Sequence, residues 1–160
     1  MNDRFVDAFL RFGGAGTPGV LLSIILEIPI FLFSLTYGWL PINLFSSISI
    51  LIGLFLIILF LVLSLWSLKA LPFEKRGKAL VKDGPYHYLR HPSYFAKIFL
   101  LLPGLSFIFR IWLPILTIPL LMVIWNNVVK EEEKILKKDF GHEFDQYCSE
   151  TGKFFPRLKI

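Results

Sequence analysis

Long apolar blocks separated by short polar stretches dominate the chain. They cover residues 18–39, 43–68, 92–109 and 112–129. The first two are long enough to cross a bilayer core of about 30 Å, and the last two are barely long enough. We therefore predict an all-α, polytopic membrane protein with about four transmembrane helices and a C-terminal cytoplasmic helix. For the last two blocks we expect two thin crossings, with a tilted hairpin that crosses incompletely as the alternative.

The polar ends of the chain also have helical patterns. Residues 1–12 alternate charged and apolar positions, which predicts an amphipathic helix on the membrane surface that breaks at Gly13. Residues 126–140 continue the fourth block as a charged helix. Gly141 should interrupt this helix, and 142–150 should add one or two further turns.

Composition agrees with a membrane protein. The 160 residues suggest one domain, 1–160, and 55% of them are hydrophobic, above the roughly 45–50% of soluble domains. The net charge is +5, but the basic residues lie beside apolar blocks, so we expect contact with membrane lipid and none with nucleic acid. Cys148 is the single cysteine, which excludes an intrachain disulfide and a cysteine-cluster zinc site, and we expect no metal. The first apolar block is too long for a cleavable signal peptide.

The distribution of basic residues predicts the orientation. The stretch from Lys69 to Asp83 is the most basic loop, which the positive-inside rule assigns to the cytoplasm. Both termini should then be cytoplasmic, and the predicted tight turn from Gly38 to Asn43 should lie outside.

Two charged residues fall within the apolar blocks, where a charge needs a partner. Glu27 is either a substrate or proton contact or a helix-packing residue bonded to a neighbouring Ser or Trp. Lys97 either extends to the headgroups or points into a polar cavity. The sequence leaves both choices open.

A short polar and aromatic stretch, residues 84–94, joins the basic loop to the third block. It reads Gly-Pro-Tyr-His-Tyr-Leu-Arg-His-Pro-Ser-Tyr. A helix can start at Pro92 but should not run through it. Free N–H groups there, beside Arg90 and His91, favour an anionic group. The alternative is a basic cytoplasmic loop with interfacial tyrosines.

Glu132 differs from the glutamates on either side of it. Residues three and four positions away are its neighbours on a helix, and for Glu132 they are Val128, Val129, Ile135 and Leu136. A carboxylate on this apolar face needs a partner, which is either a structural Arg or Lys or a bound ligand.

Taken together, these features carry a family resemblance over residues 78–157. They are Leu80-Val81, Gly84-Pro85-Tyr86, Arg90-His91-Pro92-Ser93-Tyr94, Glu132-Glu133, Phe140-Gly141, Glu143, Tyr147 and Pro156. The chain resembles the isoprenylcysteine carboxyl methyltransferases and the wider group of integral-membrane methyltransferases that includes the phospholipid N-methyltransferases.

The resemblance implies a cofactor, S-adenosylmethionine, bound between the Arg-His-Pro region and the C-terminal helix. The cofactor contacts that it implies are Lys78, Ala79, Leu80, Val81, Tyr86, His91, Pro92, Ser93, Tyr94 and Glu132. The candidate catalytic residues are Arg90, Glu133 and Lys130.

Two departures from the family bear on the acceptor. Ala96 stands where the family often has glycine. Val128 stands where the family has an arginine thought to meet the substrate carboxylate, and Lys130 is the nearest basic residue.

The resemblance implies a lipophilic acceptor, either the carboxylate of a prenylated cysteine or a phospholipid ethanolamine headgroup. A carboxylate is already ionised and needs no base. An ammonium headgroup needs one, for which Glu133 or His87 is the candidate. The rival interpretations are an NADPH-dependent enzyme similar to the membrane steroid reductases, and a non-catalytic membrane protein.

Overall fold

The computed structural model describes residues 16–72, 75 and 79–157. The predicted surface helix 1–12, its break at Gly13 and the candidate residue Lys78 lie outside the described residues. The regular elements of the described part are all helices.

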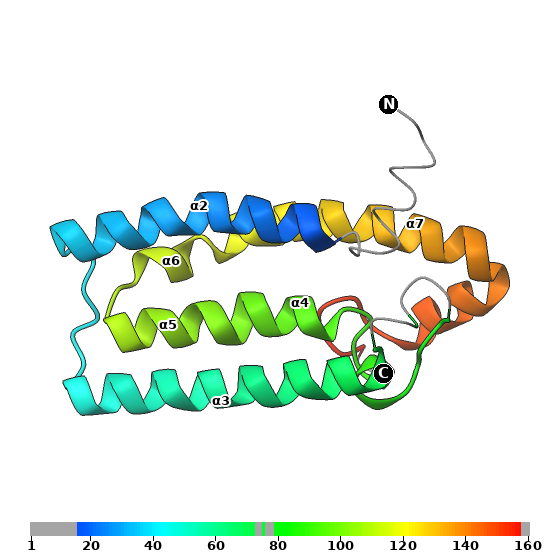
Figure 1. The fold of residues 1–160 in the computed structure, drawn as a ribbon, viewed down its shortest axis with the longest axis horizontal. Helices are drawn as coiled ribbons and strands as arrows, with labels where there is room; N and C mark the ends of the chain where they lie inside the picture. Colours follow the sequence, from blue (N-terminus) through cyan, green and yellow to red (C-terminus); the bar gives the residue numbers. More distant parts are fainter. Residues whose placement is uncertain (1–15, 73–74, 76–78, 158–160) are drawn as a thin grey trace.

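The first two helices are long and antiparallel. Helix α2 spans Gly16–Tyr37 and α3 spans Ser46–Ala70, close to the predicted blocks. They do not pack mainly on each other: α2 lies against α7, and α3 lies against α5 (Figure 1). The predicted tight turn between them is instead an extended connection, held by an antiparallel bridge between Pro41 and Ile111.

The third apolar block forms one helical rod with an irregular middle. It contains α4 (Pro92–Ala96), the π-helical turn η3 (Lys97–Leu101) and α5 (Leu102–Phe109). The rod begins at Pro92, as predicted. Pro103 has no N–H to donate to the preceding turn, and the wider turn just before it accommodates that gap.

The fourth block does not form a single helix, so the predicted span 112–129 is corrected here. Helix α6 covers only Leu113–Leu116, and α7 begins after Thr117 as Ile118–Glu150. Prolines near the start of each piece interrupt the backbone hydrogen bonding. The predicted charged extension is confirmed, and it bends at Gly141, whose φ of 50° and ψ of −123° are not helical.

Three helical stretches have the length and apolar composition needed to cross a bilayer, namely Gly16–Tyr37, Ser46–Ala70 and Pro92–Phe109. Their outer faces expose large apolar side chains such as Ile25, Leu51 and Leu65. Surfaces of this kind suit lipid rather than water. The protein is an all-α membrane protein, and the fourth crossing stays a prediction.

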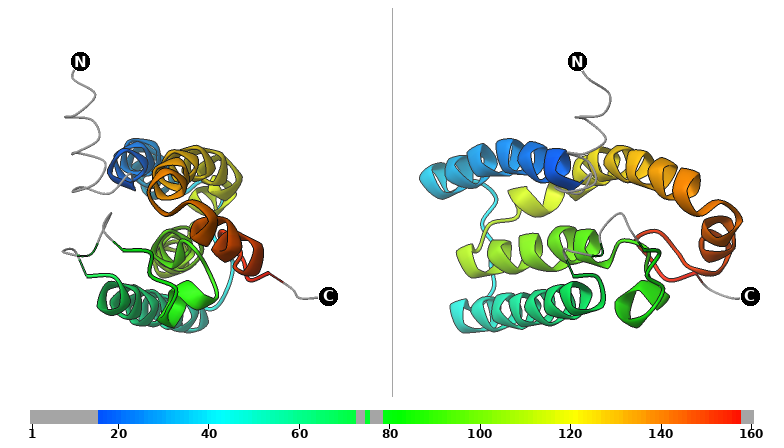
Figure 2. Two further views of the ribbon diagram at one scale, coloured as in Figure 1. Left: turned by 90° about the vertical axis from the view of Figure 1, so that its right-hand side faces the viewer. Right: turned by 45° about the vertical axis from the view of Figure 1, so that its right-hand side comes forward.

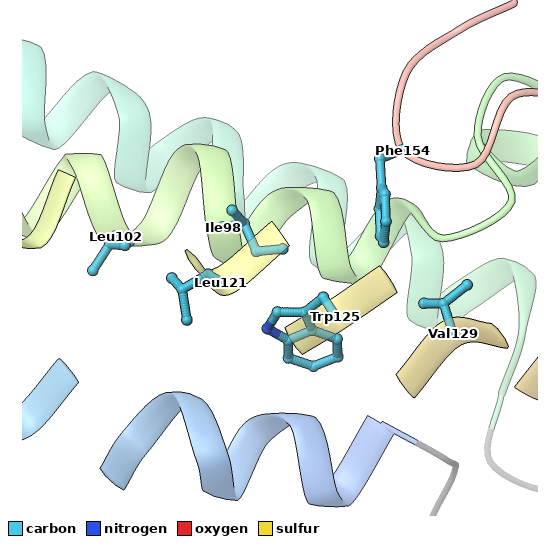
Figure 3. Packing of buried hydrophobic residues seen from close by; sticks show 6 residues of the cluster. All are labelled: Ile98, Leu102, Leu121, Trp125, Val129 and Phe154. Carbon is cyan, nitrogen blue, oxygen red and sulfur yellow. The ribbon is translucent and has the colours of Figure 1, made fainter. Parts of the chain in front are cut away.

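A small core joins the layers near one end of the bundle. It contains Ile98, Leu102, Leu121, Trp125, Val129 and Phe154 (Figure 3). Figure 2 shows the C-terminal part of α7 turning back toward α3 and α4, and this return brings Phe154 to the core. The same end carries the start of α2, the end of α3 and the start of α4.

Helices α3 and α5 approach most closely at two glycines. A Cβ atom on Gly53 would lie 2.7 Å from the carbonyl oxygen of Gly104 and 2.6 Å from a side-chain carbon of Ile108. Since a backbone carbonyl cannot move aside alone, any side chain at Gly53 must separate the helices. Small residues at such crossings let membrane helices pack tightly.

We predict that Gly53→Ala destabilises the protein by about 1–3 kcal/mol because of this overpacking. Thermal unfolding in detergent measures the effect. Ser47→Ala is the matched control, since Ser47 is exposed on the same helix. Equal unfolding temperatures for the two variants would contradict the close α3–α5 contact.

Candidate functional site

The polar stretch identified in the sequence pairs with the C-terminal segment. Leu89 and Gly152 form a parallel bridge. The Arg90 amide donates to the Gly152 carbonyl at 2.8 Å, and the His91 amide donates to the Lys153 carbonyl at 3.1 Å. The chain's return after α7 therefore holds the Arg-His-Pro turn in place.

Glu133 is the centre of a partly buried charge network. Its Oε1 accepts from Arg90 Nε at 2.9 Å and lies 3.3 Å from His91 Nε2. Its Oε2 lies 3.3 Å from the Lys153 ammonium, which also donates to Asn126. The Glu133 side chain is 16% exposed and that of Arg90 is 12% exposed.

The environment of Glu133 keeps it ionised. Burial alone would raise the pKa of its carboxyl, but the hydrogen bond from His91 and the charge and hydrogen bond of Arg90 outweigh burial and lower the pKa to about 2. Arg90 also donates to the Thr151 and Cys148 carbonyls. Its guanidinium thus binds the segment that follows α7, residues 151–157, as well as Glu133. We call this segment the return segment.

Glu132 lies in a more open and more aromatic setting than Glu133. Its Oε2 accepts from the Tyr94 hydroxyl at 2.9 Å and lies 3.8 Å from His91 Nδ1, and 30% of its side chain is exposed. The Tyr94 ring stacks on His91 at 5.5 Å between centroids and lies 4.4 Å from Trp125. We call Glu132, Tyr94 and His91 the aromatic–acidic cluster. The sequence argument that Glu132 needs a partner is thus answered by a hydroxyl and an imidazole.

An apolar cavity of about 470 Å³ lies next to this cluster, lined by residues of α2, α3, η3, α5 and α7. Trp125 and Lys97 are part of its wall. The Lys97 ammonium is 5.4 Å from the centroid of the Tyr94 ring and 5.7 Å from that of Trp125. Within the described lining, Glu27 and Lys97 are the two charged residues, so the cavity suits an apolar ligand with few polar groups.

The structure brings only some of the predicted site residues together. His91, Tyr94 and Glu132 form the aromatic–acidic cluster, and Pro92 and Ser93 begin the helix beside it. The Tyr86 carbonyl accepts a hydrogen bond from the Tyr147 hydroxyl at 2.6 Å. Burial raises the pKa of Tyr147, so the Tyr147 hydroxyl keeps its proton.

The remaining candidates form no hydrogen bond or ion pair with the cluster in the part of the chain that the structure describes. Ala79, Leu80 and Val81 precede the 3₁₀ turn η2 (Gly84–His87), and none of them hydrogen-bonds to the cluster within the described chain. Lys130 is exposed on α7 and forms no ion pair with any residue that the structure describes.

Sequence reasoning missed Lys153 and Trp125. Lys153 lies in the closing Lys-Phe-Phe-Pro run, which gave no sign of an inward charge. Trp125 donates to the Ser23 hydroxyl at 2.9 Å, and its signal was a tryptophan about two helical turns before the Glu132-Glu133 motif of α7.

Fold and site together define an all-α membrane protein with a polar site at one end of its helices and an apolar cavity beside it. The model of the isoprenylcysteine carboxyl methyltransferase (ICMT) family matches residues 44–138. This is more than half of the chain, which therefore belongs to that family.

One curated relative aligns over part of the chain. Nickel-cobalt-cadmium resistance protein NccN of Alcaligenes xylosoxydans xylosoxydans is 32% identical over 87 residues. The aligned region covers 54% of this chain and 40% of the relative, so less than half of the relative's length is represented.

We predict that Glu133→Gln destabilises the protein by about 2 kcal/mol, because it leaves the partly buried Arg90 without its counter-charge. The folded pKa of Glu133 is depressed from 4.5, so its contribution is complete above pH 4.5 and declines as the pH falls toward 2. Wild type should therefore lose stability toward pH 3 faster than Glu133→Gln does, as measured by unfolding in detergent.

The matched control is Glu131→Gln. Glu131 is 60% exposed and pairs only with Lys134 in the described region. Its loss should change stability by less than about 1 kcal/mol. If both variants behaved alike, the central place of Glu133 in the fold would be wrong.

Proposed function

We propose that the protein is an S-adenosylmethionine-dependent methyltransferase whose acceptor is lipophilic and lies in the apolar cavity. The observation that carries this proposal is the continuity of the two sites: Tyr94 contacts Glu132 on one side and Trp125, a wall of the cavity, on the other. A soluble donor and a membrane acceptor need two such environments side by side. Membership of the family supports the reaction class.

The aromatic–acidic cluster suits the donor chemically. When bound, S-adenosylmethionine supplies an electrophilic methyl group on a positively charged sulfur. The partly exposed Glu132 carboxylate offers acceptor oxygens to hydroxyl or ammonium groups. The faces of Tyr94 and His91 offer a surface for adenine or for a cation. Ala79, Leu80, Val81, Tyr86, Pro92 and Ser93 remain proposed contacts from the resemblance, as does Lys78.

The chain's own residues would act by positioning and by excluding water. Arg90 and Glu133 hold the return segment over the Arg-His-Pro turn, so we assign both to positioning rather than to contact with the acceptor. Phe154 and Trp125 close the site with apolar surface. Alignment of this kind can supply several kcal/mol of a transfer barrier.

For the acceptor we propose the carboxylate of a prenylated cysteine or a similar lipophilic acid. Methylation of an ammonium headgroup requires a base, and Glu133 with a pKa of about 2 is a very weak one. A carboxylate requires none, since it is ionised at neutral pH. The phospholipid headgroup therefore stays the second candidate.

The orientation of the protein in the membrane can be inferred from the residues gathered at one end of the helix bundle. The cluster, the end of α3 and the return segment share this end, as do Lys69 in the last turn of α3 and Lys82, which pairs with Glu143 of α7. We propose that this end faces the cytoplasm, together with both termini.

We predict that S-adenosylhomocysteine stabilises the protein in detergent, by about 2.7 kcal/mol at 100 times its dissociation constant. Glu132→Gln should weaken this ligand roughly tenfold or more, since a charged hydrogen-bond acceptor is lost. Tyr94→Phe should have a smaller effect, and Glu131→Gln should have none. A stabilisation by NADPH without one by S-adenosylhomocysteine would contradict the methyltransferase and favour the reductase-like alternative.

The acceptor class is tested by transfer of labelled methyl to prenylcysteines and to aminophospholipids. We expect label on the prenylcysteine carboxylate, which appears as a base-labile ester. Base-stable label on the aminophospholipid alone would establish the second candidate instead.

A further inference from the structure

Glu27 places a carboxylate in the middle of α2, a membrane helix. Only one of its two oxygens has a hydrogen-bond partner in the described part of the chain. One oxygen, Oε1, accepts from the Thr117 hydroxyl, which ties α2 to the junction of α6 and α7. The other oxygen, Oε2, is buried and has no hydrogen-bond partner among the described residues. An unsatisfied polar atom in such surroundings is costly, so the helix-packing role alone does not explain why the residue is a glutamate.

The cavity lies on the same side of α2. Glu27 belongs to its lining together with Ser23, which lies one turn earlier and accepts from Trp125. Four residues of helix correspond to about 6 Å. Glu27 therefore lies about 6 Å further along α2 from the aromatic–acidic cluster than Ser23, the residue that contacts Trp125. The described lining of the cavity therefore has two charged positions along its length, Lys97 near the cluster and Glu27 beyond it.

The match to the family does not include this position. It begins at residue 44, so α2 and Glu27 lie outside it. Helix α2 nevertheless completes the site, because a Cβ atom on Gly16 would collide with the Tyr94 hydroxyl and one on Gly19 would lie 3.1 Å from the Trp125 ring. A specificity that belongs to this chain would therefore be expected on α2.

We propose that the cavity binds a lipid whose apolar chain carries a hydroxyl group, and that Glu27 Oε2 is the partner of that hydroxyl. This rests on the proposed function and narrows its acceptor class. A hydroxyl both donates and accepts, so it satisfies Glu27 whether the carboxyl is ionised or neutral. The rest of the chain contacts the aliphatic and aromatic lining, and an acidic end group lies toward the Lys97 ammonium.

The experiment compares palmitic acid with a series of hydroxypalmitic acids in which the hydroxyl moves along the chain. Binding is measured by thermal shift of the full chain in lipid nanodiscs at a fixed probe-to-lipid ratio. We expect one hydroxyl position to bind about five to ten times more tightly than palmitic acid. That preference should vanish in Glu27→Leu while palmitic acid itself still binds.

Glu27→Gln keeps an oxygen for Thr117 and a polar group for the ligand, so it should retain much of the preference. This variant separates recognition from a simple loss of folding. Equal binding of all probes to wild type would overturn the proposal, because water would then be enough to satisfy Glu27. A preference that persists in Glu27→Leu would overturn it as well.

These binding measurements do not depend on methyl transfer by the protein. If the methyltransferase function fails, S-adenosylhomocysteine does not stabilise wild type, whatever the probes do. If only the hydroxyl proposal fails, S-adenosylhomocysteine still stabilises wild type, whereas the hydroxypalmitic acids bind wild type no more tightly than palmitic acid.

Discussion

The ionised carboxylate of Glu133 connects three parts of the chain, namely α7, the polar turn and the return segment. It binds Arg90 and His91 of the polar turn and Lys153 of the return segment. Consecutive residues of a helix point about 100° apart. With Glu133 fixed against these partners, the rotation of α7 is fixed too, and Glu132 is directed toward Tyr94. A structural ion network thus decides the orientation of the carboxylate that can meet a ligand.

Inside the membrane region, polar groups are satisfied locally, which leaves the few exceptions informative. Ser34, Ser67 and Ser106 donate to the carbonyl one turn earlier, and Ser49 donates to the Phe107 carbonyl across the α3–α5 contact. Lipid offers no alternative partner, so these hydroxyl groups are expected to form hydrogen bonds within the protein. Against that background Glu27 Oε2 is an exception in the described part of the chain, and Glu27 lines the apolar cavity.

The sequence predicted what depends on local pattern. Apolar block length located α2 and α3 within a few residues, and Pro92 marked the start of α4. The neighbours of Glu132 three and four positions away marked it as a residue in need of a partner. The break at Thr117 was not foreseen, because prolines indicate a bend without saying whether the helix continues. Glu133 looked solvated beside Lys130 and Lys137, since its partners Arg90 and Lys153 come from distant segments and no local spacing reveals them.

The two charged residues in the described lining of the cavity lie at different positions along its length. The Lys97 ammonium, over the rings of Tyr94 and Trp125, is at the end next to the cluster, and the Glu27 carboxyl is further along. In surroundings of low polarity, such charges act strongly at distances of several ångströms. Under the proposed function, the Lys97 ammonium would draw an acidic acceptor toward the end of the cavity where the methyl donor binds, and it would repel an ammonium headgroup from that end.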